Sequence, residues 1–152
     1  MSSGNSIYLV GNITRDLELR YTQSGLPNVT FGVAVSRRWQ NRQSNEWEEA
    51  TSYFDVVCWR ELAEHAAESL SKGSRVIVVG RLEQRSWETE DGQKRSKVEI
   101  IADEVGPSLR WATAQLAKTE RRQRASETPS YGSEAAPVEI IPSSYIEEED
   151  PF

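Results

Sequence analysis

The feature of this sequence that most restricts its fold is the alternation of apolar and polar residues with a period of two. In residues 28–36, Val29, Phe31, Val33 and Val35 are separated by single small or polar residues. Successive side chains of a strand point to opposite faces, so this spacing predicts one buried face. Strand-like patterns occur over 7–10, 28–36, 51–59, 75–87 and 94–105. Patterning of this kind over most of the first 106 residues argues against a helical bundle.

One segment, 60–72, departs from the alternation and has helical spacing instead. Its apolar residues recur at helical intervals, and these are Leu62, Ala63, Ala66, Ala67 and Leu70. Gly73 follows where a helix would end, and the Asp-Gly pair at 91–92 predicts a hairpin between the last two strands. Five strands with one helix between the third and the fourth predict an all-β fold, the five-stranded Greek-key barrel called the OB-fold. A β-sandwich is the alternative, but it gives no reason for a helix at this point.

The distribution of charge divides the chain into a body and a tail. The net charge is −6, yet the residues from Ser126 onward hold seven acids and no Lys or Arg, which leaves all 18 basic residues in the first 125. The tail is also rich in Ser, Pro, Ala and Glu, a composition typical of disorder. We therefore predict a barrel domain over 1–111, a basic extension over 112–125 and a disordered acidic tail over 126–152. Residues 108–124 fit either a helix or an extra strand, because "SLRWATAQL" also alternates.

The composition argues against catalysis. The chain has one His and one Cys, no pair with metal-ligand spacing and no Gly-rich loop that opens a helix. We expect His65 to have a surface or packing role in the helix and Cys58 to lie in the core. No enzyme activity, cofactor or metal is therefore predicted. The start of the chain lacks a signal-peptide pattern and the longest apolar runs are four or five residues, which predicts a cytoplasmic protein that binds no membrane.

Aromatic residues give the first positive indication of function. Strand parity over 51–59 places one apolar set on the core face, namely Phe54, Val56 and Cys58. It places a second set on the other face, namely Tyr53, Asp55, Val57 and Trp59. Large rings beside an acid indicate a wetter surface, and outward-facing rings on a barrel suit the stacking of nucleic-acid bases.

Basic residues accompany these rings along the sequence. Arg37, Arg38 and Arg42 surround Trp39, and Arg85 precedes Trp87 by two residues. The remaining basic residues near the rings, the hairpin turn and the helix end are Arg60, Lys72, Lys94, Arg95 and Lys97. Cations interleaved with tryptophans on hairpins predict a groove that neutralises phosphates while the bases stack.

Three segments together resemble the bacterial single-stranded DNA-binding protein family. They are "IYLVGNITRDLELRYTQSGLPNVTFGVAVSRRW", "YFDVVCWRELAEHAAESLSKGSRVIVVGRLEQRSW" and the acidic ending "EEEDPF". The resemblance covers residues 5–106 and returns at the last six residues. It implies an OB-fold, a homotetramer and sequence-independent binding of single-stranded DNA without catalysis, during replication, recombination and repair in the bacterial cytoplasm, on the nucleoid.

The resemblance also assigns roles to individual positions. The stacking positions of the family fall on Trp39, Tyr53, Trp59 and Trp87, and its phosphate-contacting positions fall on Arg42, Lys72 and Arg85. We add Arg37, which is near Trp39, and Arg95, which follows the Asp-Gly turn, to the phosphate-contacting set. Asp55 and Glu61 stand where some members have bases, so no phosphate contact is expected from them. Some relatives use the stretch after the barrel as a strand that clasps a neighbouring subunit, and "LRWATAQL" fits that role.

The acidic ending predicts a second binding function. Its order is acids first and then an aromatic residue, namely Glu147, Glu148, Glu149, Asp150, Pro151 and Phe152. This order suits a partner pocket with an apolar slot for Phe152 and a basic rim for the acids. The resemblance implies that replication, recombination and repair proteins bind there.

Two other functions fit parts of the sequence. An OB-fold adaptor that binds proteins would use the tail but would leave four rings exposed without a stacking partner. An RNA-binding cold-shock-like protein would need a tightly clustered aromatic motif, which this chain lacks. The role of Trp47, in the hairpin beside Trp39, is left open by the sequence.

Overall fold

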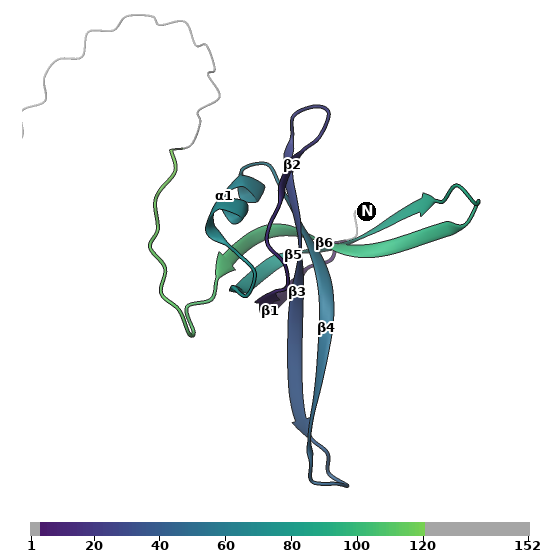
Figure 1. Cartoon of the computed structure of the whole chain (residues 1–152), viewed down its shortest axis with the longest axis vertical. Coiled ribbons are helices and arrows are strands. Elements are labelled where there is room, and N and C mark those ends of the chain that lie inside the picture. Colours follow the sequence, from purple (N-terminus) through teal and green to yellow (C-terminus); the bar gives the residue numbers. More distant parts are fainter. Residues whose placement is uncertain (1–3, 121–152) are drawn as a thin grey trace, which may run out of the picture. The chain divides into compact units, whose positions relative to one another are not determined.

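The computed structural model describes residues 4–120, and these hold six strands and one helix (Figure 1). The strands are β1 (Ile7–Ile13), β2 (Leu19–Tyr21), β3 (Pro27–Gln40), β4 (Trp47–Trp59), β5 (Arg75–Glu88) and β6 (Lys94–Pro107). The helix α1 (Glu61–Ser69) lies between β4 and β5. The five predicted strands and the predicted helix are therefore present, and most strands are longer than predicted. The short strand β2 was not predicted, because three residues carry too little alternation.

Five strands close into a barrel. The strand order is β1-β5-β6-β4-β3-β2, and β1 pairs with β3 as well as with β5. All of these pairings are antiparallel except the one between β4 and β6, where Val56 is opposite Ile100. The predicted OB-fold barrel, with its helix between the third and fourth long strands, is confirmed. Strand β2 is an addition that pairs with β3 alone.

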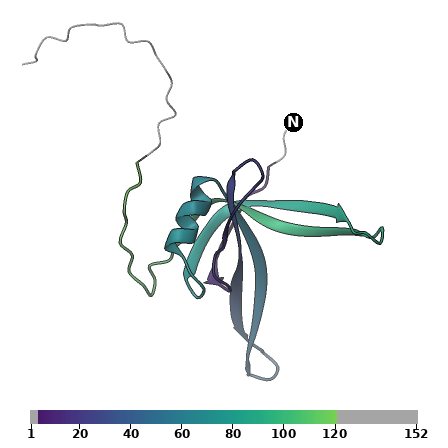
Figure 2. The same ribbon diagram turned by 45° about the horizontal axis from the view of Figure 1, so that its top comes forward.

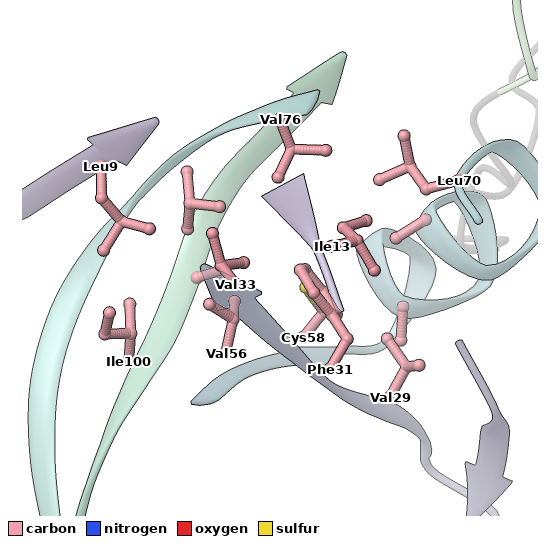
Figure 3. Packing of buried hydrophobic residues seen from close by; sticks show 14 residues of the cluster. Leu9, Ile13, Val29, Phe31, Val33, Val56, Cys58, Leu70, Val76 and Ile100 are labelled. Carbon is pink, nitrogen blue, oxygen red and sulfur yellow. The ribbon is translucent and has the colours of Figure 1, made fainter. Parts of the chain in front are cut away.

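The core of the barrel consists of the inward-facing residues of the alternating strands (Figure 3). Phe31 is its largest fully buried side chain, and Val29 and Val33 lie beside it on the same strand. Ala63 and Ala66 of α1 are also buried, so the apolar stripe of the helix covers this core. Cys58 is fully buried, as predicted, and His65 is exposed, which favours the surface role over the packing role.

Two positions on β4 differ from the predicted parity. Phe54 was predicted to be a core residue, but its side chain is 36% exposed. It shares a face with Val56 and Cys58, yet it lies one step closer to the hairpin, just outside the buried run Val56–Cys58 of β4. Val57 was predicted to face a wetter surface and is instead buried. Alternation thus identifies the face of a residue but does not say where along the strand the core stops.

Two hairpins extend beyond the barrel (Figures 1 and 2). Every residue of β3 after Val35 is exposed, and so is every residue of β5 after Gly80. Asn45 and Gly92 have φ of 63° and 78° in the two turns. Gly92 belongs to the Asp-Gly pair that predicted the second hairpin, and glycine adopts this left-handed conformation without steric cost. The hairpins carry most of the predicted binding residues.

Residues 108–120 have neither helix nor strand in the single chain. The predicted helix is therefore not seen over 108–120, whereas the clasping strand needs a second subunit and stays a prediction. Trp111 is 71% exposed, with the Arg75 and Arg110 guanidinium carbons 4.6 and 5.2 Å from its ring centroid. The compact unit runs to Leu116. The predicted disordered tail over 126–152 lies outside the described residues.

Candidate nucleic-acid interface

The β3–β4 hairpin carries exposed rings on both of its faces. Trp59 pairs with Asn28 and Tyr53 with Ala34, so these two rings point to one side of the hairpin together with Trp47. Trp39 pairs with Glu48 and therefore points to the opposite side. The predicted rings are all exposed, at 73% for Tyr53, 41% for Trp59 and 39% for Trp39. A ligand that contacts all of them has to pass around the hairpin.

The β5–β6 hairpin holds the fourth predicted ring. Trp87 is 41% exposed and lies directly opposite Arg95, while Arg85 lies opposite Lys97 on the same face. The Arg85 guanidinium carbon is 5.6 Å from the centroid of the Trp87 ring. A hollow of ≈ 520 Å³ is lined by Gln84, Ser86, Trp87, Glu88, Lys94, Arg95 and Ser96. A ring beside two cations provides both a stacking surface for a base and counter-charges for a phosphate.

Arginines also accompany the rings of the first hairpin. The guanidinium carbon of Arg37 is 5.4 Å from the Trp39 centroid, and that of Arg38 is 4.8 Å from the Trp47 centroid. These contacts hold the side chains together through the attraction between a cation and a ring face. Arg37 and Arg85 therefore lie over the rings that they were predicted to accompany, whereas Arg38, predicted beside Trp39, lies over Trp47.

The five predicted phosphate-contacting residues are exposed, but they lie in different places. Arg37 is on β3, Arg42 is in the β3–β4 turn, and Arg85 and Arg95 are on the second hairpin. Lys72 lies apart from them, between α1 and β5, where its backbone N–H donates to Asp16 Oδ1 at 2.9 Å. Over residues 4–120 none of the five forms an ion pair, so their charges face solvent.

A cluster of four charged side chains lies on the outer face of the barrel and was not predicted. Asp55 accepts a hydrogen bond from Arg15 at 3.3 Å and pairs with Lys97 at 2.5 Å. Lys97 also lies 3.6 Å from Glu99. Burial alone would raise the pKa of Asp55, but the hydrogen bonds and charges of Lys97 and Arg15 outweigh it and lower that pKa. The pairs join residues far apart in the sequence, so no local pattern shows them.

An apolar strip runs along the outer face of β1 and β5. It consists of Tyr8, Val10, Ile77 and Val79, which are 79%, 37%, 43% and 38% exposed. Tyr8 lies opposite Val79 and Val10 opposite Ile77, so the four side chains are neighbours. Contiguous exposed apolar surface marks interaction sites more often than isolated residues do.

No arrangement for catalysis or metal binding is seen in the described part of the chain. Residues 4–120 hold no group of three or more side chains that would bind a metal ion. Burial raises the pKa of the Cys58 thiol to about 12, so that thiol is neutral and unreactive near neutral pH. Within the same residues, no helix has the length and apolar character that crossing a membrane requires.

Comparison with known proteins identifies a family. The model of the single-strand binding protein family matches residues 4–108. Single-stranded DNA-binding proteins of Mycobacterium leprae and Mycolicibacterium smegmatis are 48% and 52% identical to this chain. The matches cover 92% and 80% of this chain and 84% and 74% of theirs.

Two solved structures share the fold. A Plasmodium falciparum SSB in complex with ssDNA matches with a TM-score of 0.64 and 26% identity, over 71% of this chain and 97% of that one. A deletion mutant of the Thermus aquaticus single-stranded DNA binding protein matches with a TM-score of 0.60 and 32% identity, over 68% of this chain and 50% of that one.

Proposed function

This chain belongs to the single-strand binding protein family, and we propose on that basis that it binds and protects single-stranded DNA without regard to sequence. Members of the family bind DNA and are not enzymes. The observation that carries the proposal for this chain is the set of exposed rings with cations beside them. Trp87 beside Arg85 and Arg95, and Trp39 beside Arg37, each offer a stacking surface next to a phosphate counter-charge.

The geometry supports a binding mode in which bases stack and phosphates pair. Tyr53 and Trp59 receive bases on one side of the β3–β4 hairpin, and Trp39 receives one on the other. Every base has a π-face, so stacking on these rings tolerates any sequence, at about 1–3 kcal/mol per base. Arg37, Arg42, Lys72, Arg85 and Arg95 neutralise phosphates, which also carry no sequence information.

We further propose that the chain assembles as a homotetramer. The support in the structure is the apolar strip of Tyr8, Val10, Ile77 and Val79, which lies on a regular sheet face. Burying such a strip against a second copy removes apolar area from water at about 25 cal/mol per Å². The number of subunits, four, is taken from the family resemblance.

The cellular role that we propose is DNA replication, recombination and repair in the bacterial cytoplasm, on the nucleoid. Partner enzymes would be recruited through Glu147, Glu148, Glu149, Asp150, Pro151 and Phe152, which lie outside the described residues. The support is their order, because acids followed by Pro and Phe suit a pocket with a basic rim and an apolar slot.

Fluorescence titration with oligo-dT tests the DNA-binding proposal directly. Stacking of bases on the exposed tryptophans should quench their emission strongly. The logarithm of the affinity should fall linearly with the logarithm of the salt concentration, by about 0.7 per phosphate contact. Duplex DNA of the same length serves as the control and should bind more weakly. Little quenching at any salt concentration would contradict the proposal and favour a protein-binding adaptor.

A further inference from the structure

The charged cluster of Arg15, Asp55, Lys97 and Glu99 connects three parts of the barrel. Arg15 follows β1, Asp55 is on β4, and Lys97 and Glu99 are on β6. Asp55 lies between the two cations, and Lys97 lies between the two acids. The side chain of Glu99 is 12% exposed and that of Asp55 25%, whereas Lys97 and Arg15 are 40% and 54% exposed. The cations are therefore the outer members of the cluster.

Arg15 reaches Asp55 by crossing β3 at a glycine. Gly32 is the register partner of Asp55, and the backbone N–H of Thr14 donates to the Gly32 carbonyl at 3.0 Å. A Cβ at Gly32 would clash with Thr14 Oγ1, whereas it would lie 3.5 Å from Arg15 Nη1, which is an ordinary van der Waals distance. The glycine therefore leaves room for the Thr14 side chain, next to the point where the Arg15 side chain passes over β3.

The cluster lies between two of the proposed stacking rings. Tyr53 is two residues before Asp55 on the same face of β4. Lys97 lies opposite Arg85, on the hairpin face that carries Trp87. A single strand that contacts both Tyr53 and Trp87 therefore passes over the cluster, where two carboxylates would repel its phosphates unless cations cover them.

We propose that Lys97 and Arg15 contact a phosphate of the bound single strand between the Tyr53 and Trp87 stacking sites, with Asp55 as the residue that positions both cations. The proposal rests on the proposed single-stranded DNA binding. An ammonium group has three donors and a guanidinium group has five, so each cation keeps donors for a phosphate while it stays paired with Asp55. Their exposure leaves those donors accessible.

The competing explanation is that Lys97 only neutralises the two acids. Replacing Lys97 alone cannot separate the two, because the acids would then repel DNA in either case. The double variant Lys97→Ala, Asp55→Asn does separate them, because it removes one charge of each sign and leaves the net charge unchanged. Arg81→Ala, Asp103→Asn is the matched control, since Arg81 and Asp103 form a similar pair at 3.6 Å on β5 and β6.

The experiment is a titration of the full chain and both double variants with fluorescein-labelled oligo-dT, over a range of salt concentrations. We expect the Lys97 double variant to bind more weakly, with a log–log salt slope smaller in magnitude by about 0.7, and the control to match the wild type. A wild-type slope and affinity in the Lys97 double variant, or an equal loss in the control, would overturn the proposal. Failure of the wild type to bind at all would instead contradict the proposed function.

If the melting temperature shows that the double variant does not fold, a second variant tests the phosphate contact. Arg15→Gln, Asp55→Asn removes the other outer cation together with the acid that it pairs with, so the net charge again stays unchanged. We expect it to lower the magnitude of the slope by about the same amount. A slope equal to that of the wild type in this double variant would overturn the phosphate contact.

Discussion

At the scale of the residue, exposure separates side chains that hold the fold from side chains that bind. Trp59 and Trp87 are each 41% exposed although tryptophan is among the most costly side chains to leave in water. Phe31, by contrast, is fully buried at the centre of the barrel. Truncation of Trp59 or Trp87 should therefore weaken DNA binding, whereas truncation of Phe31 should destabilise the fold.

We expect Trp59→Ala and Trp87→Ala each to weaken oligo-dT binding by about 1–3 kcal/mol while the melting temperature changes little. The reason is that each substitution removes a stacking surface and almost no core contact. Anisotropy of a labelled oligo-dT measures the affinity without relying on tryptophan emission. Tyr21→Ala is the control, because that ring is exposed on β2, outside both hairpins, and the variant should bind normally. Unchanged affinity in both Trp59→Ala and Trp87→Ala would refute the stacking assignment.

The two phenylalanines Phe31 and Phe54 form a matched pair for stability. Phe31→Ala removes a fully buried ring and should destabilise the protein by about 3–5 kcal/mol. Phe54→Ala removes a ring that is 36% exposed and should cost clearly less. Denaturant unfolding of both variants measures the difference. Equal losses would mean that the face of Phe54 is covered, for instance by a second copy of the chain.

At the scale of the element, the sequence predicted what local patterns encode and missed what distant pairing decides. The alternation of Val29, Phe31 and Val33 and the Asp-Gly turn at 91–92 each identify an element within a few residues of its observed bounds. The position of Trp39 on the face opposite Tyr53 depends on hairpin register, which alternation in separate strands does not supply. The pairing of Arg15 with Asp55 across β3 joins residues 40 positions apart and is likewise invisible in the sequence.

Asp55 on β4 pairs with Arg15, which follows β1, and with Lys97 on β6. We expect the stability that these pairs provide to depend on pH. The pKa of Asp55 is lowered from the ordinary value of 3.8, so ionised Asp55 stabilises the fold above that pH, and the stabilisation is lost as the pH falls through the lower pKa of the folded state. We expect wild type to melt at a higher temperature than Asp55→Asn near neutral pH, with the gap closing below pH 3.8. Thermal unfolding of both proteins across this pH range measures the difference in melting temperature.

The control for that comparison is Asp103→Asn, because Asp103 is 61% exposed and its pair with Arg81 should contribute little. The hydrogen bond from Lys97 to Asp55 raises the pKa of Lys97, so its own contribution persists at neutral pH and is lost only as the pH rises through that raised value. A gap between wild type and Asp55→Asn that stays constant down to acid pH would contradict the assignment to ionised Asp55.

At the scale of the whole molecule, the described barrel has two surfaces with different chemistry. The hairpins present rings and unpaired cations, whereas the outer face of β1 and β5 presents the apolar strip of Tyr8, Val10, Ile77 and Val79. The proposed surface for DNA and the proposed surface for a second subunit are therefore separate and could act at the same time. Changes to one should leave the other intact.

Val79→Glu should reduce the mass of the particle in solution, because it places a charge in the middle of the apolar strip. Light scattering coupled to size exclusion measures the mass of the wild type and the variant. Val98→Glu is the matched control, since Val98 is an exposed valine on the β5–β6 hairpin and lies outside the strip. If both variants keep the wild-type mass, the strip is not the subunit interface.

The role that we propose for the acidic segment at 147–152, the recruitment of partner proteins, can be separated from an effect of charge alone. Phe152→Ala keeps all four acids, so an apolar slot in the partner would lose its occupant while long-range attraction is unchanged. We expect this variant to lose most of its affinity for replication, recombination and repair proteins, measured by pull-down with the full chain as bait. Its oligo-dT affinity should equal that of the wild type.

Deleting 147–152 should likewise abolish recruitment. The deletion should leave oligo-dT binding equal or slightly tighter, because we expect the acids to compete weakly with DNA for the basic residues. Normal recruitment by Phe152→Ala, with loss only when the acids are neutralised, would show that the segment acts through charge and not through the ring.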